Sequence, residues 1–203
     1  MPASSYRRWG KRALDVALSA GGLIALGPLF LLIAAAIKLA DPGPVFFRQT
    51  RMGLGFRPFQ ILKFRTMRAN AAGPSITRGS ADPRVTRLGG PLRRLKLDEL
   101  PQLVNVLRGE MSLVGPRPEV PKYVELFKED YARILTVKPG ITDFASVHFR
   151  DEAAVLDGFA DAEHGYVSEV LPQKVALYHR YVADLGLSTD LKILLATMRK
   201  LAA

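Results

Sequence analysis

The longest apolar stretch of the chain lies close to its N-terminus. From Val16 to Ile37 no residue carries a charge, and a straight helix of that length would reach about 33 Å, enough to cross the hydrocarbon core of a bilayer. The stretch is too long for the apolar region of a signal peptide, and no small-residue cleavage site with a polar mature start follows it. The pattern therefore predicts a membrane helix.

Basic residues flank this stretch on both sides, which bears on its topology. Four precede it and four follow it, namely Arg7, Arg8, Lys11 and Arg12, and then Lys38, Arg48, Arg51 and Arg57. The positive-inside rule places both ends on the cytoplasmic side, and Gly27-Pro28 near the middle favours a bend because proline lacks the backbone donor. We therefore expect a re-entrant helix over residues 1–40 that enters the membrane, bends and returns. The alternative is a kinked helix that crosses once.

A small β-hairpin is predicted directly after this helix. Asp41-Pro42-Gly43-Pro44 ends the helix, and apolar residues lie on either side of a Gly53-Leu54-Gly55 turn, namely Val45, Phe47, Phe59 and Ile61. Towards the C-terminus two segments carry apolar residues at helical spacing, Leu171, Val175, Tyr178 and Val182 in one and Leu191, Leu194, Met198 and Leu201 in the other. Such helices can lie on lipid head groups or pack on the core, and periodicity favours neither.

The charge of the chain indicates what kind of partner it binds. The net charge of +10 and the pI of about 10.1 indicate an anionic partner, which is nucleic acid, anionic lipid or a phosphorylated small molecule. Between Arg48 and Lys96 there are twelve Lys or Arg and one acid, whereas from Glu119 to Glu169 eleven acids face five bases, typical of a solvated outer layer. Residues 69–81, rich in Ala, Gly, Ser and Thr, predict a loop beside the basic region.

Several classes of chemistry are excluded or unsupported. The chain has no cysteine, so a disulfide framework, a thiolate zinc site and a thiol nucleophile are excluded. The phosphate-cradling and dinucleotide glycine motifs, the nucleophile elbow and the H-E-x-x-H zinc motif are absent from the sequence. The three histidines have no metal-ligand spacing. Asp15, at the edge of the apolar stretch, is expected to pair with Arg12 or Lys11 rather than do chemistry.

An acidic pair beside a basic cluster is the strongest candidate site. Asp98 and Glu99 precede Pro101, and because proline is tolerated only in the first helical turn, the pair lies at or just before a helix N-terminus. Adjacent residues point about 100° apart on a helix, so two separate tasks are more natural than one symmetric acid and base pair. One carboxylate can attack phosphorus while the other binds Mg²⁺. The alternative is a pair that only stabilises the helix start.

A second candidate element follows at residues 109–118. There Pro116 and Pro118 fix the backbone on both sides of Arg117, and such a turn can present a preset guanidinium to a phosphate. A rigid loop with an exposed charge is the alternative.

Taken together, these motifs resemble a known family, the bacterial sugar transferases called monotopic phosphoglycosyl transferases. The resemblance covers most of the chain and is carried by Lys11-Arg12, Asp15, Pro28, Gly43-Pro44, Phe47, Gln49, Arg51, Gly53, Gly55, Lys63-Phe64-Arg65-Thr66-Met67, Asp82-Pro83-Arg84, Thr86-Arg87 and the run LDELPQLVNVLRGEMSLVGPRP from Leu97 to Pro118. That last run is highly specific. The chain departs from many relatives at residues 143–149, which follow Pro139-Gly140-Ile141-Thr142, and this affects the sugar and nucleotide details more than the reaction.

The resemblance implies roles for individual residues. Asp98 is then the nucleophile, and Glu99, beside Asp98, binds Mg²⁺ as the cofactor. Phosphate or nucleotide contacts are implied for Arg93 and the Pro116-Arg117-Pro118 turn, with Lys63 and Arg65 as weaker candidates. The family moves a sugar phosphate from a nucleotide sugar, usually a UDP-sugar, to a polyprenol phosphate such as undecaprenyl phosphate. UMP leaves in this first membrane step of glycoconjugate assembly.

The resulting expectation is an α+β, mostly helical fold. It combines the re-entrant membrane helix of residues 1–40 with a catalytic domain over residues 41–203 that holds the hairpin and interfacial amphipathic helices. The protein is expected at the cytoplasmic face of the bacterial inner membrane as the minimal catalytic form, bound to membrane lipid, with a homodimer left open. A nucleic-acid partner is not expected because few aromatic residues accompany the basic stretch. A membrane-bound nucleic-acid-binding protein and a non-catalytic scaffold on anionic lipid are the rival interpretations.

Overall fold

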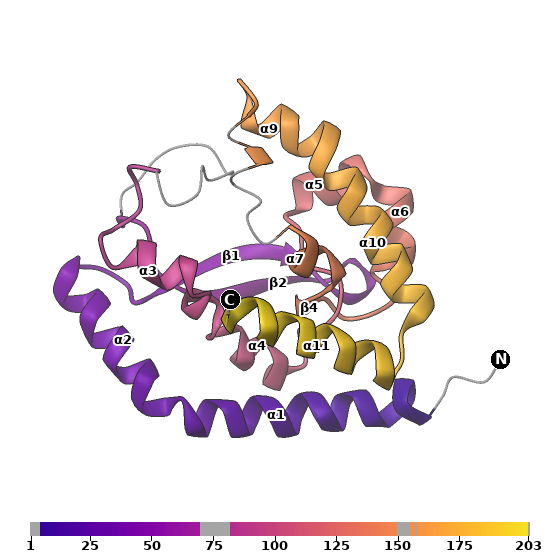
Figure 1. Cartoon of the computed structure of the whole chain (residues 1–203), viewed down its shortest axis with the longest axis horizontal. Helices are drawn as coiled ribbons and strands as arrows, with labels where there is room; N and C mark the ends of the chain where they lie inside the picture. The colour runs from indigo at the N-terminus through magenta and orange to yellow at the C-terminus, as the bar shows by residue number, and fades with distance from the viewer. Residues whose placement is uncertain (1–4, 70–81, 150–154, 157, 203) are drawn as a thin grey trace.

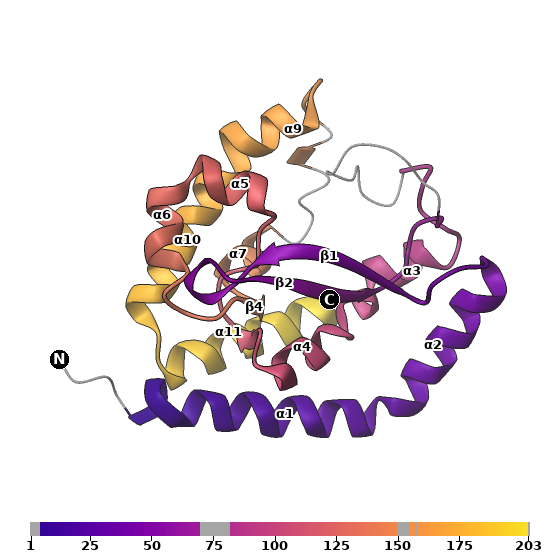
Figure 2. The ribbon, with the colours of Figure 1, turned by 180° about the vertical axis from the view of Figure 1, so that it is seen from behind.

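The computed structural model describes residues 5–69, 82–149, 155–156 and 158–202, and the predicted loop at residues 69–81 therefore lies outside them except for its first residue. Helices predominate, and the strands form two small sheets, one antiparallel and one parallel. The predicted α+β, mostly helical class is confirmed. In both views the hairpin of β1 (Phe46–Met52) and β2 (Pro58–Phe64) crosses the middle of the molecule (Figures 1 and 2).

The N-terminal apolar stretch forms two helices that meet at an angle. A short π-helical turn (Tyr6–Gly10) leads into α1 (Lys11–Ala25), and α2 (Gly27–Ala40) follows after a break at Leu26. Pro28 lies in the first turn of α2, where its missing donor costs nothing, so the bend occurs where the sequence predicted it. Figure 1 shows α1 along one side of the molecule and α2 turning away at its end.

Helix length and hydropathy limit which of the described helices can cross a bilayer. Within the described part of the chain, no helix taken singly has the length and apolar character needed to cross a bilayer. Taken together, α1 and α2 are long and apolar enough to cross a bilayer, but the two helices are bent by 62° relative to each other.

The hairpin forms as predicted and packs on α2. Strands β1 and β2 are antiparallel, with Phe46 opposite Phe64 and Met52 opposite Pro58, and the connection holds a short 3-10 turn (Leu54–Phe56). Phe64 is buried with Ile33 and Ile37 of α2. This contact attaches the bent helix pair to β2, a strand within the basic region.

The remaining elements surround the hairpin. Along the chain they are α3 (Gly89–Arg94), a 3-10 turn (Leu97–Glu99), α4 (Gln102–Arg108), β3 (Ser112–Val114), α5 (Pro121–Leu126), α6 (Lys128–Ile134), β4 (Gly140–Thr142), α7 (Phe144–His148), α9 (Ala162–Gly165), a π-helical turn (Tyr166–Val170), α10 (Leu171–Asp184) and α11 (Leu187–Ala202). Strands β3 and β4 pair in parallel, Ser112 opposite Gly140. Helix α4 packs against both α1 and β2, so it lies between them (Figure 2).

The two C-terminal helices differ in whether their apolar stripe packs on the core or stays exposed, the choice that periodicity left open. In α10 the residues Leu171, Val175 and Tyr178 are buried in a core that includes Tyr131 and Ile134 of α6, so this stripe packs on the protein. In α11 three of the four stripe residues stay exposed, Leu191 at 45%, Met198 at 65% and Leu201 at 41%, while Leu194 packs on the core. Of these two helices, α11 is therefore the one that presents its apolar stripe outward.

The predicted pairing of Asp15 with Arg12 or Lys11 is wrong. The carboxylate of Asp15 accepts hydrogen bonds from the Ser112 hydroxyl (3.0 Å) and the Leu113 amide (2.9 Å) on β3. Arg12 instead donates to the carbonyls of Val106 and Leu107 in the last turn of α4, where the helix no longer supplies an amide donor four residues further on. Lys11 donates to the Val114 carbonyl and to Asp190. The prediction failed because the side chains of Lys11, Arg12 and Asp15 all bind other elements rather than one another.

Candidate active site

The site begins with the way α4 is fixed to the exposed edge of strand β2. The side chain of Asn105 accepts from the Leu62 amide (3.0 Å) and donates to the Gln60 carbonyl (2.8 Å). It thereby replaces the neighbouring strand that this edge of the hairpin lacks. Since α4 follows the acidic pair directly, this contact sets the pair against the side chains of β2.

The acidic pair lies in a tight turn before α4, as the position of Pro101 predicted. Lys96 has a left-handed backbone (φ 57°), and the 3-10 turn from Leu97 to Glu99 begins immediately after it. Asp98 and Glu99 are 7% and 9% exposed. Two adjacent carboxyl groups are thus withdrawn from water, a costly arrangement unless partners compensate.

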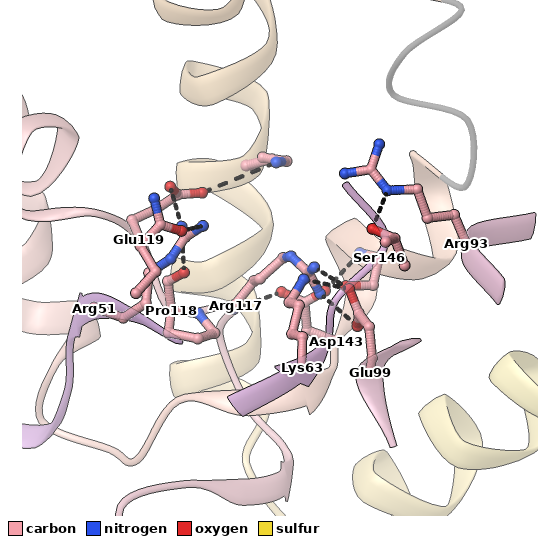
Figure 3. A network of polar contacts seen from close by, with 12 residues as sticks. Arg51, Lys63, Arg93, Glu99, Arg117, Pro118, Glu119, Asp143 and Ser146 are labelled. Carbon is pink, nitrogen blue, oxygen red and sulfur yellow. Dashed lines mark hydrogen bonds and ion pairs between the residues drawn. The ribbon is translucent and has the colours of Figure 1, made fainter. Parts of the chain in front are cut away.

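Glu99 has such partners. The Arg117 guanidinium binds both carboxylate oxygens, Nη2 to Oε1 at 2.5 Å and Nη1 to Oε2 at 3.2 Å. Lys63 from β2 donates to Oε1 at 2.8 Å. Figure 3 shows these three side chains converging from the hairpin, the acidic turn and the Pro116-Arg117-Pro118 turn. Three of the residues that the sequence singled out are therefore brought together.

The ion pairs decide the protonation state of Glu99. Burial alone would raise the pKa of this carboxyl, but the charges of Arg117 and Lys63 outweigh it and hold the pKa well below its usual range. Burial also lowers the pKa of Lys63, although the Glu99 charge opposes this. Glu99 is accordingly a fixed negative charge between two cations.

Asp98 lies in the opposite environment. Burial raises its pKa and the neighbouring Glu99 charge raises it further, while Lys63, Lys96 and Arg93 act in the other direction. Among the described residues the Oδ1 atom of Asp98 has no hydrogen-bond partner. One oxygen of this buried carboxyl group is therefore left unpaired within the described part of the chain.

Arg93 and Arg65 have different surroundings. The Arg93 side chain donates from Nε to the Thr66 hydroxyl at 2.9 Å, and burial lowers its pKa while the Asp98 charge opposes this. Arg93 is thus a cation close enough to interact with the Asp98 charge, and Figure 3 shows it apart from the Lys63 and Arg117 side chains that meet Glu99. Arg65 is 6% exposed and binds the Asp41 and Pro42 carbonyls in the loop after α2. These contacts assign Arg65 to the end of the helix pair.

The Pro116-Arg117-Pro118 turn is held by the small parallel sheet. Gly140 donates to the Pro116 carbonyl and Gly115 to the Thr142 carbonyl. The backbones of Gly115, just after β3, and Gly140 approach so closely that a Cβ on Gly140 would lie 2.1 Å from the Gly115 nitrogen. Both prolines are buried, so their role is to fix the backbone, and the Arg117 side chain is the part of the turn that reaches the acidic pair.

Sequence analysis missed two groups beside this turn. The buried Asp143 carboxylate accepts from the Arg117 amide at 3.0 Å, and Arg51 donates to the Pro118 carbonyl at 3.1 Å and contacts Glu119 at 3.4 Å. Figure 3 shows both groups flanking the turn. For Asp143 the only local signal was its place at the start of the segment that departs from the family pattern.

Carboxyl groups are the protein ligands that this site can offer to Mg²⁺. No cluster of three or more His, Cys, Asp or Glu side chains able to hold a metal occurs within residues 5–69, 82–149, 155–156 and 158–202. Magnesium commonly uses one or two carboxylates and completes its shell with water and substrate phosphates. Glu99 and the open oxygen of Asp98 fit that requirement, whereas an all-protein cage does not exist here.

Comparison with known proteins identifies the family. The model of the bacterial sugar transferase family matches residues 6–203. A UDP-glucose:undecaprenyl-phosphate glucose-1-phosphate transferase of Caulobacter vibrioides is 44% identical over 94% of this chain and 69% of its own length. A protein of the same name in Escherichia coli is 38% identical over 98% of this chain. A UDP-N-acetylgalactosamine-undecaprenyl-phosphate N-acetylgalactosaminephosphotransferase of Aeromonas hydrophila is 37% identical over 93%.

The extent of these matches differs between the relatives. The chain spans 41% of the Escherichia coli protein and 43% of the Aeromonas hydrophila protein, so those relatives hold further sequence outside the match. The matched part includes the hairpin, the acidic turn and the Pro116-Arg117-Pro118 turn, because the family model runs from residue 6 to residue 203. The chain belongs to the bacterial sugar transferase family.

Proposed function

We propose that this chain transfers a sugar 1-phosphate from a UDP-sugar to undecaprenyl phosphate, in the assembly of a bacterial polysaccharide. The observation that carries the proposal is the buried acidic pair, in which Glu99 is fixed by two cations and Asp98 keeps an open oxygen. The names of the relatives, which specify UDP-sugars and undecaprenyl phosphate, support the choice of donor and acceptor.

The chemistry assigned to Asp98 has two displacements at one phosphorus atom. In the first, a carboxylate oxygen of Asp98 forms a bond to the β-phosphorus of the donor, and UMP leaves with the electron pair of the bridging bond. In the second, a phosphate oxygen of the lipid attacks the same phosphorus and releases the Asp98 carboxylate. Both steps need orientation and charge neutralisation more than proton transfer.

The cations of the site fit the charge that builds up in these steps. Arg93 lies on the side of Asp98 and is partly desolvated, and Arg117 and Lys63 lie on the side of Glu99. In a site of low dielectric constant, such preset charges stabilise phosphoryl oxygens more strongly than they would in water. Glu99 and Asp98 would hold Mg²⁺, which when bound neutralises part of the donor diphosphate charge.

Membrane attachment belongs to the same proposal. The exposed apolar residues of the helix pair, Ile24 at 80%, Leu31 at 74% and Leu39 at 86%, support a re-entrant insertion at the cytoplasmic face of the inner membrane, with α11 on the head groups. An acceptor lipid would then reach the site from the same surface.

The topology can be tested with single cysteines, because the natural chain has none. We expect Ser5→Cys and Glu125→Cys to resist a membrane-impermeant thiol reagent in intact spheroplasts and to react after lysis. A Ser5→Cys protein that reacts in intact spheroplasts while Glu125→Cys does not would favour a helix that crosses once.

Release of UMP tests the reaction itself. Purified protein with Mg²⁺, undecaprenyl phosphate and a panel of UDP-sugars should release UMP, and Asp98→Asn should reduce the rate at least about a thousandfold, as expected for removal of a nucleophile. Asp130→Asn, an exposed carboxylate on α6, is the matched control and should keep wild-type activity. Undiminished release by Asp98→Asn would remove Asp98 as the nucleophile.

A further inference from the structure

We propose that Asp143 is a positioning residue that holds the backbone of Arg117, so that the Arg117 guanidinium meets Glu99 in the geometry that catalysis needs. The inference deepens the proposed function and rests on it. It follows from the hydrogen bonding of one turn rather than from any contact of Asp143 with a substrate.

The turn has a single backbone donor. Proline carries no N–H group, so in Pro116-Arg117-Pro118 the Arg117 amide alone can donate. Its acceptor is Oδ2 of Asp143 at 3.0 Å. The remaining backbone contacts of the turn run through carbonyls, Pro116 to the Gly140 amide and Pro118 to Arg51.

The second oxygen of Asp143 is also occupied. Oδ1 accepts from the Ser146 amide at 2.5 Å, which makes Asp143 the N-cap of α7. The residue is 1% exposed. One carboxylate therefore joins the turn that carries Arg117 to the start of a helix, and it sits one residue after β4, the strand that pairs with β3.

The hydrogen bond between Asp143 and the Arg117 amide matters because the guanidinium of Arg117 binds Glu99. This guanidinium binds both oxygens of Glu99, at 2.5 and 3.2 Å, and a bidentate pair is sensitive to the direction of approach. Reaction rates fall steeply with misplacement of about 1 Å, by as much as a hundredfold. A backbone released at Arg117 would move the guanidinium, Glu99 and the adjacent Asp98 together.

Capping of α7 is the competing role, and two substitutions separate it from positioning. Asp143→Asn and Asp143→Ser each keep one oxygen that can cap α7, but neither offers two acceptors for two N–H groups. Asp161→Asn is the matched control, since Asp161 caps a different helix, α9, by accepting from the Glu163 and His164 amides.

The experiment measures turnover and amide exchange on the full-length protein. We expect Asp143→Asn and Asp143→Ser to lower kcat for UMP release about 10- to 100-fold with little change in KM, and Asp161→Asn to leave both unchanged. In an Arg117→Lys background the same Asp143 substitutions should cost less than about twofold, because both act on one element. Hydrogen exchange in the peptide containing residues 116–118, where Arg117 carries the sole amide, should speed up in the Asp143 variants alone.

Contrary results are equally specific. Effects of Asp143→Ser and Arg117→Lys that multiply would overturn the proposal, as would wild-type kcat in a variant whose Arg117 amide exchanges faster. A kcat loss matched by the same loss of folded protein would assign Asp143 to capping and overturn it as well. If the wild-type protein released no UMP, the proposed function would fail. Unchanged exchange of the Arg117 amide in Asp143→Ser would separately refute the claim that Asp143 holds the Arg117 backbone.

Discussion

Two regions of the molecule bury carboxylates, and they differ in whether every carboxylate oxygen has a hydrogen-bond partner. At the junction of α1 and α11, Asp190 is 1% exposed and accepts from Tyr181 on one oxygen and from Tyr6 and Lys11 on the other, at 2.8, 2.5 and 2.6 Å. In the acidic turn, Glu99 is paired in the same thorough way, but Asp98 beside it keeps an oxygen with no partner in the described part of the chain.

The difference separates structural carboxylates from reactive ones. A buried carboxylate whose oxygens all accept hydrogen bonds holds the elements of its partners together. A buried carboxylate with an unpaired oxygen lowers the stability of the folded state. Proteins retain such a cost where the group has a further task. The comparison therefore supports the proposed chemical role of Asp98 and a structural role for Asp190, and stability measurements on matched Asp to Asn variants can test both.

The largest expected effect on stability is at Asp190. Asp190→Asn leaves Lys11 buried beside a neutral group, and we expect the free energy of unfolding to fall by about 3–5 kcal/mol, as for other broken buried pairs. Urea unfolding in detergent measures this. Asp184→Asn, which removes an exposed carboxylate at the end of α10, is the control and should change stability by less than about 0.5 kcal/mol.

A smaller loss is expected at Glu99. Glu99→Gln leaves Lys63 and Arg117 without their counter-charge, but these side chains are 18% and 27% exposed and water can take over part of the pairing. We expect a loss of about 1–3 kcal/mol in unfolding free energy. A loss as large as that of Asp190→Asn would contradict the view that the site is the more open of the two regions.

Asp98→Asn should shift stability in the opposite direction. Because burial and Glu99 raise the pKa of Asp98, the folded state disfavours its charged form, and the neutral amide should raise the unfolding free energy by about 0.5–2 kcal/mol at pH 7. A destabilised Asp98→Asn protein would mean that Asp98 is a structural carboxylate like Asp190.

The same substitution makes a prediction about pH. An aspartate whose folded pKa is raised above the unfolded value of about 3.9 costs stability only when it is ionised. The advantage of Asp98→Asn over wild type should therefore be complete above the raised folded pKa, shrink as the pH falls through it, and vanish near the unfolded value. Unfolding curves of both proteins between about pH 4 and 8 measure the difference, and an advantage that grows towards acid would refute the assignment.

The smallest effect is expected at Tyr178 in the core beneath α10. Its side chain is fully buried, and within the described residues its hydroxyl finds no hydrogen-bond partner. Removing an unsatisfied polar atom is neutral or mildly favourable, so Tyr178→Phe should raise stability by less than about 1 kcal/mol. Tyr181→Phe is the informative contrast, because its hydroxyl binds Asp190 and the Val114 carbonyl and its removal should destabilise.

Local signals in the sequence predicted the elements whose partners lie nearby along the chain. Gly53-Leu54-Gly55 predicted the hairpin turn, Gly27-Pro28 predicted the bend, and Pro101 predicted the start of α4 just after the acidic pair. In each case a glycine or proline restricts the backbone within a few residues, so the prediction needs no knowledge of the fold.

Long-range pairing explains what the sequence did not predict. Asp15 binds β3, about half the chain away, and Asp190 binds Tyr6 across 184 residues, so the incorrect pairing of Asp15 with its helix neighbours was the natural local choice. Asp143 was passed over for the same reason, since its partner Arg117 lies 26 residues earlier. Arg65 and Lys63 look alike in the sequence, yet Lys63 binds Glu99 and Arg65 binds the loop after α2.

The bonds from Tyr6 and Lys11 to Asp190 also set an order of events during protein synthesis. At a ribosomal rate of roughly 5–20 residues per second, the partner of Lys11 emerges on the order of 10–40 s after Lys11 itself. For roughly the first half of that interval α1 has neither Asp190 nor the β3 strand to bind. The contact between Lys11 and Asp190 therefore forms late in the synthesis of the chain, after α1 has met β3.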